Sequence, residues 1–390
     1  MKKILIIASV IVLIIFLSVF VYIIFFGTPK SVDDVFTTFG LGGPQEQVIV
    51  PVTPIEGGVV ETPSVAAFDF SKPLNKITDR PIAGMGFIGT TTIRYAEKGT
   101  GHLYQMDLLE GEEELISNTT YRRVLSAIFS DDGTSVIFEI EGSNNLEIFV
   151  GSITKDNMGE TTLVGVLLPE GAHDAYFSNG EMGVTYLLPK SAGSEVRTYS
   201  IPEKTDRGNY TLPQKDLRGA WPSYVYVTPT ANLSGYIYDV RNQKPEYVTE
   251  GGFGLTAFPY TNGVVVTSFR NEELQSIAYE DDNVYTIPIE VLPEKCADTH
   301  QATSTLVCAA PEDRSSWGAY PDDWYKGITS SEDVFWKVSV WNNSALQVLD
   351  PQEYVRSIDV AKIISNNTGD IFLFIDKNDN SLWFAPFLGS

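Results

Sequence analysis

Aromatic and acidic side chains are concentrated between Ala309 and Glu332, a segment that we interpret as a loop inserted between two strands. Aromatic rings contact sugars or apolar groups, and carboxylates accept hydrogen bonds from hydroxyl and ammonium groups. Large aromatic residues are costly on a loop unless they pack, so the loop either caps the domain or binds a sugar, peptide or protein. The predicted binding residues are Trp317, Tyr320, Asp322, Asp323, Trp324 and Tyr325.

The chain has two cysteines, Cys296 and Cys308, which flank a polar segment that we interpret as a hairpin. Cysteines that face each other across an antiparallel pair are close enough for a disulfide, and an exported domain meets an oxidising environment. We therefore predict a disulfide between them, which contributes roughly 3 kcal/mol by closing a short loop. Two buried thiols are the alternative, and a zinc site with His300 lacks a fourth ligand.

Signals for catalysis are weak. The three histidines, His102, His173 and His300, are isolated, and no nucleophile elbow, zinc-binding helix motif or phosphate-binding loop is present. His102 follows a Gly-Thr-Gly turn, where a structural hydrogen bond is expected. Fifty acidic residues make some close carboxylate pair inevitable, so their number does not indicate a glycosidase. We predict no enzyme activity, no cofactor and no metal.

One weak metal signal lies near the C-terminus. Asp376, Asn378 and Asn380 have the first three spacings of a calcium-binding loop. Ser381 stands where that loop needs glycine, and Phe387 stands where it needs glutamate. We interpret this segment as the turn between the last two strands.

The N-terminal segment predicts a membrane anchor. Residues 4–26 are uncharged and contain neither proline nor glycine. As a helix they would span about 34 Å, which exceeds the hydrocarbon core of roughly 30 Å. A cleaved signal peptide is the alternative, but the apolar run is too long and no cleavage site closes it. Lys2 and Lys3 precede the run, so residues 1–3 are predicted to be cytoplasmic and the rest of the chain to lie outside the cytoplasm.

Residues 27–79 are predicted to be an extended linker, because proline and glycine interrupt every short apolar stretch. If flexible, a chain of this length reaches about 40 Å. Val59–Phe70 is the exception, since its apolar residues make it a candidate closing strand for the domain that follows.

Beyond Arg80 the chain repeats one plan of short strands and polar turns with a spacing near 45 residues. The clearest copies are Leu125–Val150, Ala175–Ile201 and Ala361–Ala385. Innermost strands are expected near residues 83, 125, 174, 219, 255, 295 and 357. Such spacing is typical of propeller blades, whose sheets bury two apolar faces by stacking side by side. We predict an all-β fold over residues 80–390, a β-propeller of seven blades, with six as the alternative.

Phe129–Phe138, FSDDGTSVIF, resembles the repeat signature of TolB-like, WD40-like propellers, with Asp131 in place of the usual proline. The stretch Ile93–Phe138 and the Tyr320–Tyr325 segment are similar to uncharacterised bacterial propeller proteins with a single membrane span. The resemblance implies a protein-binding platform and carries over no catalytic residue.

The net charge of −23 repels nucleic acids and anionic lipid headgroups. We expect a single-pass membrane protein whose propeller, outside the cytoplasm, is a non-enzymatic protein-binding or scaffolding module of a bacterial cell envelope. Its expected partner is an envelope protein or glycan. The alternatives are a propeller hydrolase or lyase and a carbohydrate-binding module. Acidic and histidine side chains that converge in the central channel would favour an enzyme, and an apolar or hydroxyl-lined channel would favour binding.

Overall fold

The computed structural model describes residues 68–143, 145–155, 161–178, 182–227, 233–270, 273–300, 304–312 and 321–386. The chain divides into two units, Met1–Val59 and Val60–Ser390, and all described residues belong to the second. Among them, no helix has the length and apolar character needed to cross a membrane. The predicted transmembrane helix over 4–26 lies outside the described residues.

The described residues have an all-β fold, as predicted, built from five four-stranded antiparallel sheets and one seven-stranded sheet. The first sheets in the chain are β2 (Ile82–Phe87), β3 (Thr92–Glu97), β4 (Leu103–Asp107), β5 (Glu113–Ser117); β6 (Val124–Phe129), β7 (Ser135–Glu141), β8 (Leu146–Lys155), β9 (Thr161–Leu167); and β10 (His173–Ser178), β11 (Gly183–Lys190), β12 (Gly193–Ser200), β13 (Thr205–Leu212).

The seven-stranded sheet follows, and then the last two four-stranded sheets. Their strands are β14 (Leu217–Ala220), β15 (Tyr224–Val227), β16 (Ser234–Asp239), β17 (Glu246–Tyr260), β18 (Gly263–Arg270), β19 (Glu273–Glu280), β20 (Asn283–Ile287); β21 (Cys296–Asp298), β22 (Thr305–Pro311), β23 (Asp333–Ser339), β24 (Ser344–Leu349); and β25 (Val360–Ser365), β26 (Ile371–Asp376), β27 (Leu382–Pro386) with β1 (Asn75–Thr78). The short helices are η1 (Pro293–Lys295), α3 (Asp322–Tyr325) and η2 (Pro351–Glu353).

Strand β7 shows why these sheets stack. Val136 and Phe138 are fully buried in a cluster shared with β2, β3 and β4, whereas Ile137 packs on the opposite side with residues of β10 and β11. Alternate side chains of a strand point to opposite faces, so this sheet has two apolar faces and must lie between two others.

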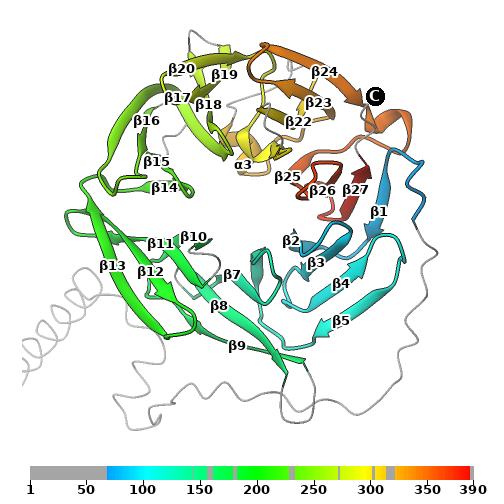
Figure 1. The fold of residues 1–390 in the computed structure, drawn as a ribbon, viewed down its shortest axis with the longest axis horizontal. Coiled ribbons are helices and arrows are strands. Elements are labelled where there is room, and N and C mark those ends of the chain that lie inside the picture. Colours follow the sequence, from blue (N-terminus) through cyan, green and yellow to red (C-terminus); the bar gives the residue numbers. More distant parts are fainter. Residues whose placement is uncertain are drawn as a thin grey trace, which may run out of the picture. The chain divides into compact units, whose positions relative to one another are not determined.

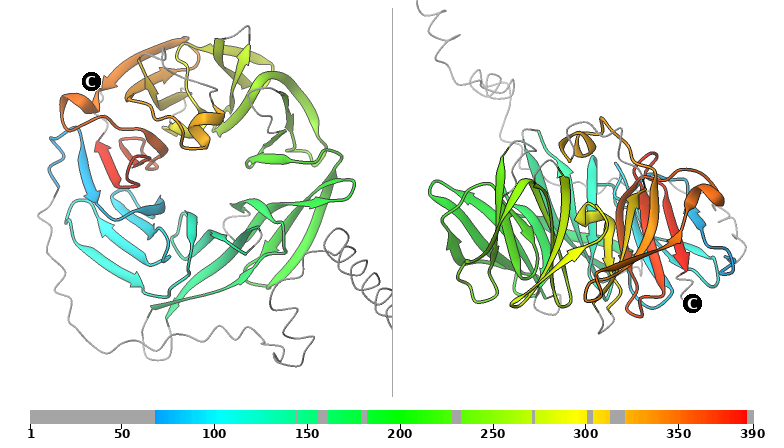
Figure 2. Two further views of the ribbon diagram at one scale, coloured as in Figure 1. Left: turned by 180° about the vertical axis from the view of Figure 1, so that it is seen from behind. Right: turned by 90° about the horizontal axis from the view of Figure 1, so that it is seen from above.

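The core clusters join each sheet to the next along the chain. They connect β2–β5 to β6–β9, then to β10–β13, to the seven-stranded sheet, to β21–β24 and to the sheet of β25, β26, β27 and β1. A further cluster joins that last sheet to β2, β3 and β4, so the series of contacts returns to its start. Figure 1 shows the sheets following one another around a ring, and in the side view of Figure 2 the strands run from one face of the ring to the other.

Strand β17 accounts for the seven-stranded sheet. Its first half, from Glu246, pairs with β16, and its second half, which ends at Tyr260, pairs with β18. One continuous strand therefore serves two four-stranded groups, β14–β17 and β17–β20. The predicted innermost strands agree with the starts of β2, β6, β10, β14, β21 and β25 within three residues, and the predicted start near 255 falls inside β17.

The predicted linker over 27–79 ends earlier in the structure than the sequence indicated. Within it, β1 pairs with β27, with Asn75 opposite Phe384, because the buried Leu74 and Ile77 dock this stretch on the last sheet. The closing strand is therefore β1. Phe68 and Phe70, at the end of the proposed closing segment, also contact the domain: their ring centroids lie 5.2 and 5.3 Å from that of Phe384.

Candidate functional site

The predicted binding loop connects β22 to β23, as expected, and its last part forms α3 near the inner side of the ring (Figure 1). Trp317 and Tyr320 lie outside the described residues. Asp322 and Asp323 are partly buried. Trp324 is only 5% exposed, and its indole nitrogen donates to both carboxylate oxygens of Asp359 at 2.9 and 3.1 Å. Its ring packs within the protein, which agrees with the interpretation of the loop as a cap.

A buried ionic cluster supports α3. The ammonium of Lys295 donates to Asp333 at 2.7 Å, to Asp359 at 2.8 Å and to Ser331 at 2.6 Å. Burial raises the pKa of Asp333, although the nearby Lys295 opposes this effect. A serine beside a lysine resembles a nucleophile with its base, but Ser331 is 3% exposed and out of reach of a substrate. We conclude that the cluster positions the loop.

Tyr325 links the loop to the interior of the ring. Its side chain is 46% exposed, and its hydroxyl donates to Oε1 of Glu294 at 2.6 Å. The other carboxylate oxygen of Glu294, Oε2, is buried without a hydrogen-bond partner. Burial raises the pKa of Glu294, and Tyr325, Arg218 and Lys295 only partly counteract this.

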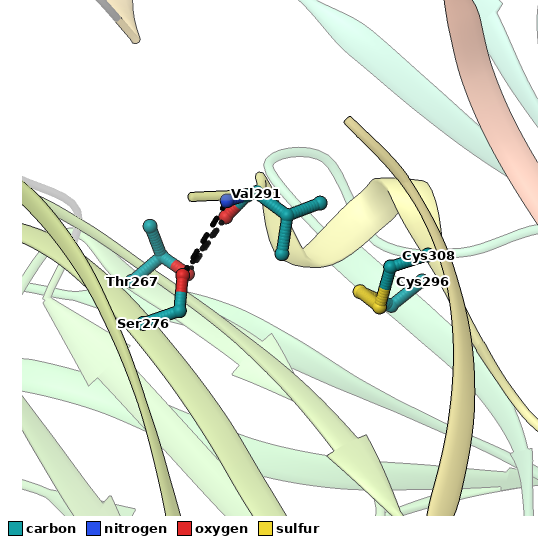
Figure 3. Close-up of a disulfide and its surroundings, with 5 residues drawn as sticks. All are labelled: Thr267, Ser276, Val291, Cys296 and Cys308. Carbon is teal, nitrogen blue, oxygen red and sulfur yellow. Dashed lines mark hydrogen bonds between the residues drawn. A yellow bond between two sulfur atoms is a disulfide. The ribbon is translucent and has the colours of Figure 1, made fainter. Parts of the chain in front are cut away.

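Several contacts fix the chain around Glu294. The backbone carbonyl of Val291 accepts a hydrogen bond from the buried hydroxyl of Thr267 at 2.9 Å and a longer one from Ser276 at 3.4 Å (Figure 3). After Glu294, the predicted disulfide between Cys296 and Cys308 is present, and the two residues are paired across β21 and β22 with Cα atoms 4.0 Å apart. Glu294 therefore lies on a short stretch that is held on both sides, by the hydrogen bonds of Val291 and by the disulfide.

Five charged side chains line an open cavity of about 510 Å³, whose walls include residues of β6, β10, β14 and β25. Each comes from a different element, η1 and the strands β7, β10, β14 and β25. We call this group the channel site: Glu139, Asp174, Arg218, Glu294 and Lys362.

Within the channel site, Asp174 is held in one position. Its Oδ2 accepts from Nε of Arg218 at 2.9 Å and from the backbone amide of Gly219 at 3.2 Å, and it lies 3.0 Å from Nδ1 of His173. The two elements involved, β10 and β14, belong to neighbouring sheets. This ion pair therefore joins two sheets at the channel wall.

Lys362 lies where two cavities meet. A second cavity, of about 440 Å³, shares six lining residues with the first, and Lys362 is the charged one among them. Burial lowers the pKa of Lys362, while Glu139 opposes the change. Its ammonium has no hydrogen bond or ion pair to any residue that the structure describes.

The channel site was not predicted from the sequence. A weak signal existed, because Arg218 and Lys362 stand within short apolar segments that were expected to be innermost strands. Of the three histidines named in the sequence analysis, His300 lines the second cavity. His102 lies 3.0 Å from the hydroxyl of Thr120, in keeping with a structural role.

The proposed turn between the last two strands is confirmed. Asp376 ends β26, and its Oδ1 accepts from the backbone amide of Asn378 at 3.0 Å, while Leu382 begins β27. Groups of three or more metal-ligating side chains are absent from the described part of the chain.

No protein-family model and no curated protein matches the chain. Among solved structures, it is similar to the uncharacterised protein lmo1340 from Listeria monocytogenes, with 10% sequence identity and a TM-score of 0.48. The match covers 82% of this chain and 96% of that one. A similarity this weak supports no inference about function.

Proposed function

We propose that residues 68–386 form a β-propeller of seven blades with TolB-like repeats. Support comes from the core clusters, which join the sheets in order and return to the first. The division of β17 between two four-stranded groups gives seven groups instead of six. Pairing of β1 with β27 supplies the closing strand, which leaves only short outer edges exposed.

We also propose that residues 4–26 anchor this domain in a membrane, with residues 1–3 in the cytoplasm and the propeller outside it. The support is the length of the apolar run and the lysines before it. An exported location is also compatible with the disulfide between Cys296 and Cys308.

The function that the geometry supports best is a non-enzymatic binding module of a cell envelope, which holds its ligand or partner at the channel end beside α3. The observation that carries this proposal is the channel site itself: five charged side chains from five separate elements line one cavity. Tyr325 connects that cavity to the loop in which the sequence predicted binding residues. Concave sites with a few converging polar groups are the usual form of ligand pockets.

A hydrolase or lyase is the second candidate, because three of the converging side chains are carboxylates, and converging acidic side chains are the feature that we expected of an enzyme. Glu294 has the raised pKa that suits a general acid. Asp174, however, is committed to Arg218, and the channel carries two cations beside the acids. This mixture of charges fits recognition of a ligand better than paired acid and base catalysis.

Site-specific photo-crosslinking in intact cells tests the binding function. A photo-reactive residue at Ile328, which follows α3 and is 68% exposed, should capture one defined partner. The matched control replaces Leu115 on the outer strand β5, which is also exposed. The same set of adducts at both positions, or none at Ile328, would contradict binding of a macromolecular partner at this end of the channel.

A further inference from the structure

Charged groups of the channel site have bonding capacity that the described protein does not use. The ammonium of Lys362 has no hydrogen bond or ion pair with a described residue, although Glu139 interacts with it electrostatically, and Oε2 of Glu294 is buried and accepts no hydrogen bond. Glu139 likewise has neither a hydrogen bond nor an ion pair within the described ranges. By contrast, Asp174 and Arg218 pair with each other.

Unpaired charges in a partly buried wall cost folding free energy, because the protein replaces water without replacing its hydrogen bonds. Native proteins satisfy most buried polar groups, so each exception needs a physical reason. Opposite charges that interact around one cavity without hydrogen bonds to each other are explained by a ligand that supplies the complementary groups.

The charge balance of the cavity narrows the class of ligand. After the Asp174–Arg218 pair is set aside, one cation, Lys362, and two carboxylates, Glu139 and Glu294, remain. A simple anion would meet both carboxylates and the overall charge of −23. A simple cation would leave the ammonium of Lys362 without a hydrogen-bond acceptor. A molecule with one carboxylate and one or two ammonium groups satisfies the whole set.

The remaining walls suit the body of such a molecule. The lining shared by the two cavities includes Ile128, Trp221, Phe258 and Ile363, which offer apolar and aromatic surface next to the charges. A volume of about 510 Å³ lies in the range of small-molecule pockets, which spans roughly 300–1,000 Å³. Amino acids and short peptides combine both charges with an apolar body.

We propose that the channel site binds a small zwitterion of the amino acid or short-peptide class, with the ligand carboxylate on Lys362 and the ligand ammonium on Glu294. This inference rests on the proposed function, because it names the ligand of that same end of the channel.

Calorimetric titration of the full chain in detergent tests the proposal with leucyl-leucine, lysyl-leucine and glutamyl-leucine. Lysyl-leucine should bind at least as tightly as leucyl-leucine, and glutamyl-leucine should bind more weakly because its extra carboxylate meets Glu139. Amidation of the C-terminus of leucyl-leucine should weaken binding at least tenfold, since a hydrogen bond to a charged group contributes about 1.5–3 kcal/mol. N-acetylation should have a similar effect.

Variants assign each ligand group to its residue. Lys362→Met should weaken binding of leucyl-leucine about as much as amidation does, and amidation should then cost nothing further. Glu294→Gln should weaken binding of leucyl-leucine about as much as N-acetylation does. In that variant, N-acetylation should weaken binding no further. The matched controls are Lys244→Met and Glu110→Gln, which change exposed residues and should bind like the wild type. Circular dichroism of each variant confirms that it is folded.

The outcomes separate this inference from the proposed function. Absence of binding by all three dipeptides up to about 10 mM overturns the ligand class. In that case the binding function still stands if photo-crosslinking at Ile328 captures a partner with the wild type and does not capture it with Lys362→Met. Binding that Lys362→Met and Glu294→Gln leave unchanged places the ligand elsewhere and overturns the inference. Cleavage of a bound dipeptide would support the ligand class and contradict a non-enzymatic module.

Discussion

Single side chains of the channel site keep hydrogen-bonding capacity that the described residues leave unused. Glu294 illustrates this, because one carboxylate oxygen accepts from Tyr325 and the other has no hydrogen-bond partner. Folding therefore disfavours the ionised form of this side chain. A residue that is retained at such a cost is expected to serve binding more than stability.

The titration of Glu294 predicts a pH-dependent stability difference. Its pKa in the folded protein is raised above the ordinary value of 4.5, so between these two values the folded state holds a proton that the unfolded state has released. The stability of the wild type relative to Glu294→Gln should therefore fall as the pH rises from 4.5 through the raised pKa, and then level off. The measurement is urea unfolding of both proteins over a pH series.

The rise in the pKa of Glu294, and with it the change in stability, is limited by three side chains that face this carboxyl group: Tyr325, Arg218 and Lys295. Glu110→Gln, at an exposed position, is the control and should show a constant difference from the wild type. A constant difference for Glu294→Gln as well would show that burial does not perturb this carboxyl group.

At the scale of elements, α3 combines a buried anchor with an exposed contact residue. Trp324→Ala should lower stability by about 3–5 kcal/mol, because it removes a buried aromatic ring and a hydrogen bond to Asp359. Tyr325→Phe should change stability by less than about 1 kcal/mol, since the side chain is half exposed. Thermal unfolding of both variants checks this, and an unchanged melting temperature for Trp324→Ala would contradict the role of α3 as a cap.

The first hairpin of the sheet β21–β24 depends on its disulfide. Replacement of both Cys296 and Cys308 by alanine should lower the free energy of unfolding by about 3 kcal/mol, because the short loop between them is no longer closed in the unfolded chain. Guanidinium unfolding measures this loss. Reduction of the wild type should give the same stability as the double variant, and two alkylatable thiols in the native protein would contradict the bond.

At the scale of the whole molecule, the first described strand closes the last sheet. Ile77 on β1 is 8% exposed and packs with residues of β2, β3, β26 and β27. Ile77→Asp places an unpaired carboxylate in that cluster and should destabilise the domain by about 3 kcal/mol or more. Lys72→Ala, at an exposed position upstream, should be close to neutral.

Hydrogen exchange provides a second measurement of how β1 stabilises the last sheet. Amide protons of β27 that pair with β1 should exchange faster in Ile77→Asp than in the wild type, while those of β7 and β11 should change less. If the amide protons of β27 exchange at the same rate in Ile77→Asp as in the wild type, β1 does not contribute to the stability of the ring.

The amino-acid sequence by itself determined most of the strands and the loop between β22 and β23, because alternation and turn residues act over a few neighbouring positions. It also indicated the pairing of Cys296 with Cys308, which are the two cysteines of the chain. It did not indicate β1, whose docking depends on the last sheet. Only the tertiary structure decided the channel site. Asp174 and Arg218 meet because β10 and β14 lie in adjacent sheets, and Glu294 reaches Tyr325 because η1 and α3 pack together. Nothing in the spacing of these residues indicates such contacts, since they arise only when whole sheets bury their apolar faces against one another.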